Sequence, residues 1–424
     1  MRYPKYIKKG DTIGFLAPSF GCAVEPYLSG FKNAQKKFEE LGYRPVLGPN
    51  CYESAGVGIS NIPEKCGAEV MEMFGRGDVD CLISCGGGEL MCEILPFVDF
   101  EKLSEAEPKW FMGYSDNTNL TYLLATLADM ASVYGPCAGT FGMEPWHKSL
   151  WDALQILTGE RQTVGGYGLW EKESLKDEEN PLVPYHVTEP LKLRTFVGKK
   201  EIYFADSGEE ESGAGNTGAN SEEKESVLTE VCSEEQSAGS AESCGEEQSA
   251  GSAESCGGEQ PAGSAESCGG EQPAEFAGTE KRTEPLRFSG RLLGGCLDCL
   301  VNLSGTRFDK TKEFAERYGQ DGIIWFFEAC DLNVFAIRRA MWQLQETGWF
   351  RFVKGFLIGR PSNGEEMMGL NAYDAVLEVA GKENVPVIMD VDLGHLPPMM
   401  PLVVGSLADV AVLGNRIEVK QILA

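Results

Sequence analysis

Short apolar runs alternate with amphipathic stretches along most of this 424-residue chain. Apolar runs that end at glycine or at a polar residue predict buried strands at 11–19, 44–47, 78–85, 110–112, 322–327, 352–358 and 385–390. Between them, apolar residues recur at helical spacing and predict helices at 26–41, 64–74, 119–127, 150–157, 334–345 and 373–380. Strands that alternate with helices in this way are typical of an α/β fold with a parallel sheet.

The pattern predicts two α/β domains around a low-complexity insert. We expect an N-terminal, Rossmann-like parallel-sheet domain at 1–165 and a linker with loops at 166–205. An acidic repeat follows at 206–284, and a second, smaller α/β domain occupies 285–424. Near the C-terminus, Gly414-Asn415 separates two apolar runs, which is a hairpin signal. Sites in parallel sheets form at the carboxyl ends of strands, so those ends are where chemistry is sought.

The insert is built on a twelve-residue unit of Glu, Gln, Ser, Ala and Gly, in which cysteine recurs at 232, 244, 256 and 268. Such a composition cannot bury enough apolar surface to offset the entropy of ordering, so we expect disorder. A metal or redox role for Cys232, Cys244, Cys256 and Cys268 is the alternative to a slipped-repeat expansion in a surface loop. Metal sites usually pair cysteines closely, which favours the expansion.

Charge and composition exclude several classes of protein. From 206 to 280 there are 19 acidic residues and one lysine, so this tract accounts for −18 of the net charge of −28 and leaves −10 for the rest. The sequence has no basic patch of the kind that would indicate nucleic-acid binding. The sequence contains no run of 18 apolar residues, so it predicts no membrane span. The charged N-terminus lacks the apolar core of a signal peptide. We therefore expect a cytoplasmic protein with free, mostly buried thiols.

Ser115 falls at a predicted corner between a strand and a helix. The run Trp110-Phe111-Met112 meets Gly113, and helical spacing begins at Asn119. Such a corner exposes the serine oxygen near free backbone amides and the positive end of a helix dipole, which suits a nucleophile. Asp116 or Asn117 can cap that helix, and the alternative is that Ser115 is an ordinary N-terminal serine cap. The pattern Gly-x-Ser-x-Asn is not the Gly-x-Ser-x-Gly of the α/β-hydrolases.

A triple glycine, Gly86 to Gly88, follows another predicted buried strand. It fits a phosphate-cradling turn, a plain tight turn, or a loop that supplies an N–H group to an oxyanion. The dinucleotide pattern Gly-x-Gly-x-x-Gly is not met. Cys296-x-x-Cys299 likewise has two interpretations, a redox or metal pair and simple core packing.

A serine nucleophile needs a base, and the chain contains three histidines, at 147, 186 and 395. His147 lies near a predicted helix start and His186 in an irregular stretch, whereas His395 follows a predicted buried strand. Glu328 ends another such strand, where a carboxylate is costly unless it is paired. A helix-capping acid is the alternative role for Glu328. The order Ser115, Glu328, His395 is the α/β-hydrolase order without its elbow.

Several separated motifs together resemble the serine LD-carboxypeptidase family, which includes muramoyl-tetrapeptide carboxypeptidases and microcin C immunity peptidases. The matching pieces are Lys9 to Ile13 with Ala17-Pro18-Ser19, Gly86 to Gly88, Gly113 to Asp116, Gly294-Gly295, Glu328 and Gly394-His395. They cover nearly the whole chain outside the insert, which the family pattern does not contain.

This resemblance implies a Ser115–His395–Glu328 triad and an oxyanion hole from backbone N–H groups near Gly88 and Asp116. It also implies two domains with the site in the cleft between them, no metal, no cofactor and a homodimer. The insert falls near the start of the second domain, where it could shield the cleft or a dimer face.

The sequence leaves the substrate open. One hypothesis is removal of terminal D-alanine from a murein tetrapeptide during peptidoglycan recycling. Another is cleavage of an aminoacyl-nucleotide toxin, for which Trp146, Trp170 or Tyr185 could stack a base, although loop aromatics commonly serve packing alone. A hypothesis of another class is a binding module that keeps the fold without turnover. A cofactor-binding Rossmann protein is disfavoured because the dinucleotide pattern is missing.

Overall fold

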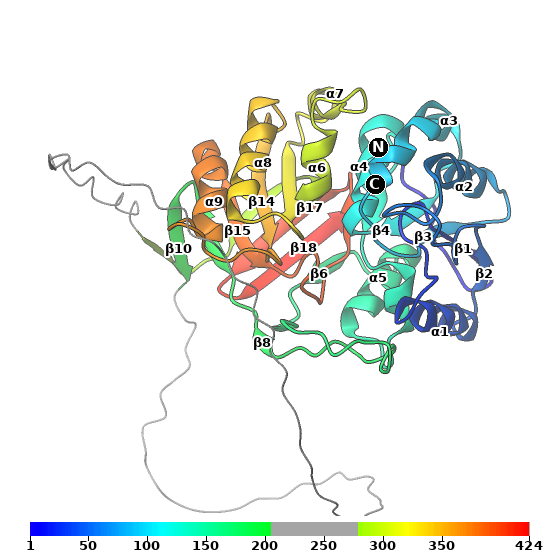
Figure 1. Ribbon diagram of the computed structural model, residues 1–424. Coiled ribbons are helices and arrows are strands. Elements are labelled where there is room, and N and C mark those ends of the chain that lie inside the picture. The colour runs from blue at the N-terminus through cyan, green and yellow to red at the C-terminus, as the bar shows by residue number, and fades with distance from the viewer. Residues whose placement is uncertain (205–278, 424) are drawn as a thin grey trace, which may run out of the picture. The chain divides into compact units, whose positions relative to one another are not determined.

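Two β-sheets organise the residues that the computed structural model describes, 1–204 and 279–423 (Figure 1). The first sheet has the strand order β16-β5-β4-β3-β1-β2. Its strands are β1 (Thr12–Leu16), β2 (Arg44–Leu47), β3 (Cys81–Ser84), β4 (Trp110–Gly113), β5 (Ser132–Tyr134) and β16 (Leu402–Val404). All pairs are parallel except β16 with β5. The parallel N-terminal sheet is therefore confirmed.

The second sheet is mixed and has the order β11-β10-β9-β15-β14-β13-β12-β17-β18-β6. Its strands are β6 (Thr163–Gly165), β9 (Arg194–Val197), β10 (Lys200–Phe204), β11 (Glu280–Arg282), β12 (Leu286–Cys296), β13 (Ile323–Glu328), β14 (Val353–Gly359), β15 (Pro386–Val391), β17 (Leu407–Leu413) and β18 (Arg416–Ile422). The central strands β12 to β15 are parallel. The predicted hairpin is β17–β18, paired from Leu407 with Ile422 to Leu413 with Arg416. The two-domain α/β fold is confirmed, and the larger sheet belongs to the second domain.

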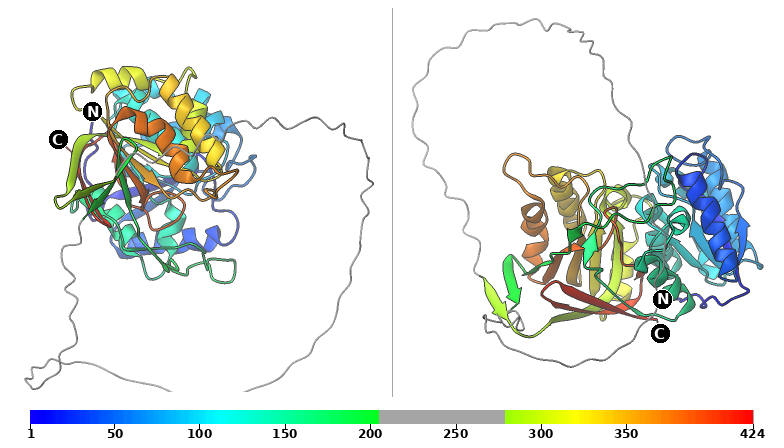
Figure 2. Two further views of the ribbon diagram at one scale, coloured as in Figure 1. Left: turned by 90° about the vertical axis from the view of Figure 1, so that its left-hand side faces the viewer. Right: turned by 90° about the horizontal axis from the view of Figure 1, so that it is seen from below.

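Each sheet is completed by a strand from the other half of the sequence. β16, from the C-terminal half, pairs with β5 of the first sheet, and β6, from the N-terminal half, pairs with β18 of the second. Figure 2 shows the two sheets and their helices side by side. Because β16 follows soon after His395, this exchange carries the His395 loop toward the ends of the first-sheet strands.

Helices cover the sheets through the apolar faces that the sequence spacing predicts. In α1, for example, Phe31, Ala34 and Phe38 are fully buried. The helices are α1 (Tyr27–Glu40), α2 (Pro63–Gly75), α3 (Phe100–Glu105), α4 (Thr118–Ala128), α5 (Lys148–Thr158), α6 (Leu297–Leu303), α7 (Thr311–Arg317), α8 (Val334–Glu346) and α9 (Ala372–Ala380). Short 3-10 helices lie at Met91–Phe97, Ser115–Asn117, Ala138–Gly142 and Gly381–Glu383. Figure 1 shows α8 and α9 lying against one face of the second sheet.

The segment expected as a linker contributes to the second sheet. Within 166–205, β9 and β10 form a hairpin, and β9 pairs antiparallel with β15. A small two-stranded sheet, β7 (Leu169–Trp170) with β8 (Glu189–Pro190), brackets the loop between them. Sequence patterns missed these strands because they are only two to five residues long.

The expected insert, 206–284, lies largely outside the described residues. So do the expectations of disorder and of a role for Cys232, Cys244, Cys256 and Cys268. Its last residues are described, and there β11 pairs parallel with β10 at one edge of the second sheet. The insert therefore joins β10 to the edge strand β11, and β13, which ends at Glu328, lies five strands away from β11 in the sheet order.

Across the two described ranges, the helices are too short or too polar to cross a membrane.

Candidate active site

Ser115 lies at the corner between β4 and the helix that follows. A single 3-10 turn comes after β4, and α4 begins at Thr118. The backbone of Ser115 has φ +62°, a region that residues with side chains rarely adopt. Such strain persists where the surroundings hold the backbone in place, and here the Ser115 amide donates to Tyr134 Oη at 3.3 Å. The predicted strand-to-helix corner is confirmed.

His395 lies in the loop between β15 and β16, and a buried ion pair fixes this loop. Asp392 Oδ1 accepts from Arg360 Nη2 at 2.6 Å, and Asp392 Oδ2 accepts from the Tyr167 amide at 2.7 Å. Arg360 Nη1 also donates to the Asp390 carbonyl at 2.7 Å. Because Asp392 and Arg360 are both buried, losing either partner would leave an uncompensated charge. The histidine therefore sits on a rigid loop.

Glu328 is the last residue of β13, and its side chain is buried. Its Oε1 accepts a hydrogen bond from Tyr134 Oη at 2.5 Å, and its Oε2 lies 2.7 Å from His395 Nδ1. Gly394 has φ +94°, and a Cβ there would lie 2.5 Å from Glu328 Oε2. Glycine therefore lets the histidine loop pass close to the carboxylate.

The three predicted residues form one hydrogen-bonded row. His395 Nε2 lies 2.8 Å from Ser115 Oγ, and His395 Nδ1 lies 2.7 Å from Glu328 Oε2. With Glu328 ionised, Nδ1 carries the proton that it donates to the carboxylate. Nε2 can then accept the Ser115 proton, which is the arrangement a histidine base requires.

The opposite charges of His395 and Glu328 shift the pKa values of both side chains. Burial by itself would lower the pKa of His395, but the Glu328 carboxylate and the Cys330 side chain together outweigh burial and raise that pKa to about 11. Burial would raise the pKa of Glu328, but His395 and hydrogen bonds from Tyr134 and Cys296 together outweigh burial and lower that pKa. The carboxylate therefore stays ionised, and the imidazole is a stronger base than a free histidine.

The triple-glycine turn passes directly beside the serine. A Cβ at Gly87 would lie 3.2 Å from Ser115 Oγ. Gly88 has φ +154°, and a Cβ there would lie 2.0 Å from Ser19 Oγ, so only glycine fits. Gly88 and Asp116 line the same cavity as Ser115. This placement favours the interpretation in which the turn serves the serine.

Asp116 anchors the turn and does not cap α4. Asn117 occupies the N-cap position without a side-chain cap, so the expected capping role of Asp116 or Asn117 is wrong. The buried Asp116 carboxylate accepts hydrogen bonds from Ser19 Oγ at 2.5 Å, the Met91 amide at 2.8 Å and Asn119 Nδ2 at 3.0 Å. It ties together three segments around Ser115, which no sequence spacing could reveal.

Cys296 and Cys299 belong to the site as well as to the packing. Cys299 Sγ lies 3.7 Å from the Ser115 carbonyl oxygen, and both thiols line the Ser115 cavity with Cys330. A hydrogen bond with Cys299, together with burial, raises the pKa of Cys296 well above its ordinary value. Thiols held protonated are poor nucleophiles and metal ligands. Within residues 1–204 and 279–423, no three His, Cys, Asp or Glu side chains are grouped to hold a metal ion.

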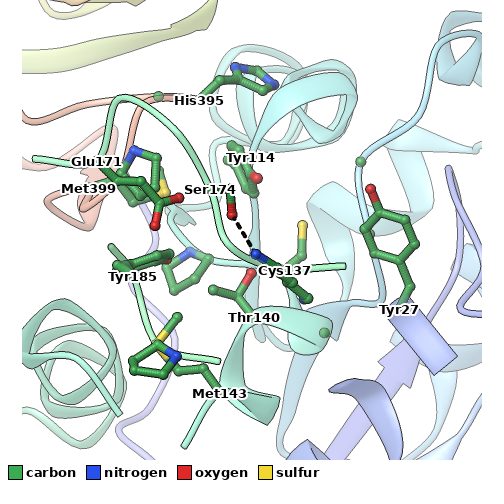
Figure 3. Close-up of a pocket in the computed structure, with 18 of the residues that line it drawn as sticks. Tyr27, Tyr114, Cys137, Thr140, Met143, Glu171, Ser174, Tyr185, His395 and Met399 are labelled. Atoms are coloured by element: carbon green, nitrogen blue, oxygen red, sulfur yellow. Dashed lines mark hydrogen bonds between the residues drawn. The ribbon is translucent and has the colours of Figure 1, made fainter. Parts of the chain in front are cut away.

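Two cavities adjoin the row of three residues, one at Ser115 and the other at His395. One, of about 280 Å³, is lined by Ser115, Gly88 and Asp116. The other, of about 200 Å³, is lined by Gly87, Tyr114 and His395 and is called the strap cavity below. Figure 3 shows Glu171, Ser174 and Tyr185 on one side of the strap cavity and Tyr27 on the other. Residues of both domains line it, as expected for a cleft.

The segment 171–185, called the strap, forms one wall of this cavity. Of the aromatic residues considered for base stacking, Tyr185 lines the cavity. Trp170 instead lies over the Arg360 guanidinium at 4.8 Å, and Trp146 packs against Phe141.

The other two histidines lie apart from the row. His147 caps α5, accepting from the Ser149 amide, and His186 Nδ1 pairs with the Glu173 carbonyl.

Comparison with known proteins decides the family. The sequence profile of the LD-carboxypeptidase N-terminal domain matches residues 13–135, and that of the LD-carboxypeptidase C-terminal domain matches 289–410. This chain belongs to the LD-carboxypeptidase family. Both matches lie within the described residues, and together they cover more than half of the chain.

Relatives come from two branches of this family of serine peptidases. The chain is 29% identical over 186 residues to Microcin C7 self-immunity protein MccF of Escherichia coli, covering 41% of this chain and 52% of that one. It is 31% identical over 145 residues to a probable murein peptide carboxypeptidase of Bacillus subtilis, covering 34% and 44%. The chain thus spans about half the length of the curated relatives it matches, or less.

Solved structures share the fold over the full length. An MccF-like protein from Bacillus anthracis has a TM-score of 0.66 at 18% identity, covering 100% of both chains. A muramoyltetrapeptide carboxypeptidase from Oxalobacter formigenes has a TM-score of 0.58 at 16% identity, covering 97% of this chain and 98% of that one. At such identities the likeness establishes the fold alone.

Proposed function

We propose that this chain is a serine LD-carboxypeptidase that removes terminal D-alanine from a murein tetrapeptide, with Ser115, His395 and Glu328 as its catalytic triad. The observation that carries the proposal is the row of two hydrogen bonds, 2.8 Å and 2.7 Å long, on a corner that exposes Ser115. Family membership supplies the class of bond, an amide between an L-centre and a D-residue.

The reaction proceeds by acyl transfer. His395 Nε2 takes the proton of Ser115 Oγ as the oxygen attacks the scissile carbonyl carbon. The amides of Gly88 and Asp116 stabilise the oxyanion, and losing one such donor costs roughly 3 kcal/mol. His395 then gives its proton to the leaving amine, and D-alanine departs. Water, deprotonated by His395, attacks the acyl-enzyme and restores Ser115.

Glu328 and Tyr134 orient the base. The Glu328 carboxylate holds the imidazole tautomer and stabilises the imidazolium that forms. Tyr134 accepts from the Ser115 amide and donates to Glu328, so one phenol links the nucleophile's backbone to the acid. We assign it a positioning role.

A second candidate is cleavage of aminoacyl-nucleotide amides, as in microcin immunity. It is favoured by the match to MccF and by Tyr27, Tyr114 and Tyr185, whose rings line the strap cavity and could stack a base. A non-catalytic binding module is disfavoured because all three triad side chains are present in a working arrangement. Cytoplasmic peptidoglycan recycling and a homodimer remain part of the proposal.

The deciding experiment offers purified protein two substrates. One is murein tetrapeptide, with release of D-alanine measured. The other is a non-hydrolysable-phosphate mimic of an aminoacyl adenylate, with cleavage measured by chromatography. D-Alanine release would support the proposal, and cleavage of the mimic alone would support the second candidate. Binding of either compound without turnover would overturn both.

Replacing Tyr134 with phenylalanine is expected to lower kcat roughly tenfold with little change in KM, because a hydrogen bond to a charged group is lost. Steady-state kinetics on the preferred substrate measure this. Tyr122→Phe is the matched control, since it removes an equally buried phenol that bonds Thr311 away from the site. Equal losses in both variants would contradict a positioning role for Tyr134.

A further inference from the structure

The strap carries a cation into a site that is otherwise acidic. Lys176 lines the strap cavity together with His395 and Gly87. Apart from His395, no other basic side chain lines either of the two cavities at the triad among the described residues. The position of Lys176 is set by the path of the strap and not by a strand of either sheet.

Lys176 is half-buried and has no ionic partner among residues 1–204 and 279–423. No carboxylate of the described residues lies within 4.0 Å of its Nζ, which sits 5.6 Å from the centre of the Tyr27 ring. Burial lowers the pKa of Lys176. A partly desolvated ammonium without a counter-charge gains more from an anionic ligand than an exposed one does.

The nearest acid in the strap cavity is already engaged. Glu171 is 5% exposed, and its Oε2 accepts a hydrogen bond from the His186 amide. It lies beyond ion-pair distance of Lys176 and only offsets part of the burial effect on the lysine. The Lys176 ammonium therefore remains available to a ligand.

The cavity on the other side of Ser115 has the opposite character. Among the described residues, it is lined by four carboxylates, those of Glu89, Asp116, Asp298 and Asp331, and by no lysine or arginine. Asp298 is itself held by the amides of Cys330 and Leu332. An anionic group of a substrate would be repelled there and attracted to the strap cavity.

We propose that Lys176 binds a carboxylate of the substrate and so makes the enzyme prefer peptides with an anionic end in the strap cavity. This inference rests on the proposed function, since it concerns the same site. Beside its scissile bond, a murein tetrapeptide offers two carboxylates of this kind. One is the C-terminal carboxylate of the leaving D-alanine, and the other is the side-chain carboxylate of a diamino acid before it. The strap cavity, at about 200 Å³, has room for such a group.

The test compares wild type with Lys176→Met on three tetrapeptides. The first has both carboxylates, the second has a C-terminal amide, and the third has lysine as its diamino acid, without the side-chain carboxylate. We expect Lys176→Met to lower kcat/KM roughly 10- to 100-fold on the first substrate. On whichever analogue lacks the carboxylate that Lys176 binds, we expect a change of less than about threefold, and this identifies the group.

Three controls keep the result interpretable. Lys172→Met removes an exposed lysine of the same strap and should leave all three rates unchanged. Lys176→Arg should recover part of the preference, because it restores the charge. Equal losses on all three substrates in Lys176→Met would overturn the inference, since they would show that Lys176 binds neither of these two carboxylates.

Binding separates this inference from the proposed function. Calorimetry with the Ser115→Ala variant and with Ser115→Ala/Lys176→Met needs no turnover. Weaker binding of the first peptide in the double variant, alongside full turnover by wild type, would support both proposals. In another outcome, wild type turns over no peptide while the double variant still binds the first peptide more weakly than Ser115→Ala does. That result would contradict the proposed function but support the carboxylate site. Equal binding by both variants would refute the carboxylate site.

Discussion

Replacing Ser115 with alanine is expected to lower kcat roughly 10⁴- to 10⁶-fold, the loss seen when a triad serine is removed from a serine peptidase. Ser115 Oγ is the atom that His395 Nε2 faces at 2.8 Å, and alanine has no atom that can take its place. Turnover of the substrate proposed above, followed as release of D-alanine with a coupled oxidase assay, measures the effect. Substrate affinity should change little, because the two cavities keep their walls.

The matched control is Ser54→Ala, which removes an exposed serine from a loop. It should retain wild-type kinetics. Circular dichroism of Ser115→Ala should match that of wild type, since alanine and serine carry the same Cβ into the φ +62° backbone. Residual turnover above about one per cent of wild type, in a preparation free of wild-type enzyme, would show that another group attacks the carbonyl.

The sequence predicted those parts of the site that local pattern controls. The run from Trp110 to Met112 is apolar because β4 is buried on both faces, and Gly113 marks its end. The same logic located Glu328 at the end of β13. In parallel sheets the ends of strands meet at one edge, so residues far apart in sequence could be expected together.

Other parts of the site depend on contacts that no local pattern records. Tyr134 reads as one more apolar residue of a short strand, yet its hydroxyl joins Ser115 to Glu328. The sequence around Asp116 predicts a helix cap, but its carboxylate instead accepts hydrogen bonds from Ser19 and Met91, which lie in two other segments. Lys176 lies in an irregular stretch without periodicity, so only the path of the strap places it in the same cavity as His395.

The exchanged strands escaped prediction for a related reason. β6 and β16 are each three residues long, too short to show alternation. Their place is set by pairing with the edge of the sheet from the other half of the chain. Domain boundaries drawn from composition therefore do not show that β16, which follows His395, pairs with the sheet of the first domain.

Replacing Glu328 with glutamine is expected to lower kcat/KM about 10³- to 10⁴-fold and to shift its pH dependence. The base works only when His395 is neutral, so the rate rises as pH increases through the His395 pKa. The Glu328 carboxylate raises that pKa, whereas burial lowers it. With the carboxylate gone, burial remains, and the acid limb of the profile should move to lower pH even as the plateau falls. Profiles of kcat/KM from pH 5 to 12 measure both effects, because the pKa of His395 in the wild type is raised to about 11.

Glu328→Asp is the matched variant, because it keeps the charge and changes only the reach of the side chain. Its acid limb should stay close to that of wild type, although its rate falls. A lower plateau without any shift in Glu328→Gln would mean that the carboxylate orients the imidazole without setting its basicity. A shift to higher pH would contradict the assignment of His395 as the base, because removing a negative neighbour cannot make an imidazole easier to protonate.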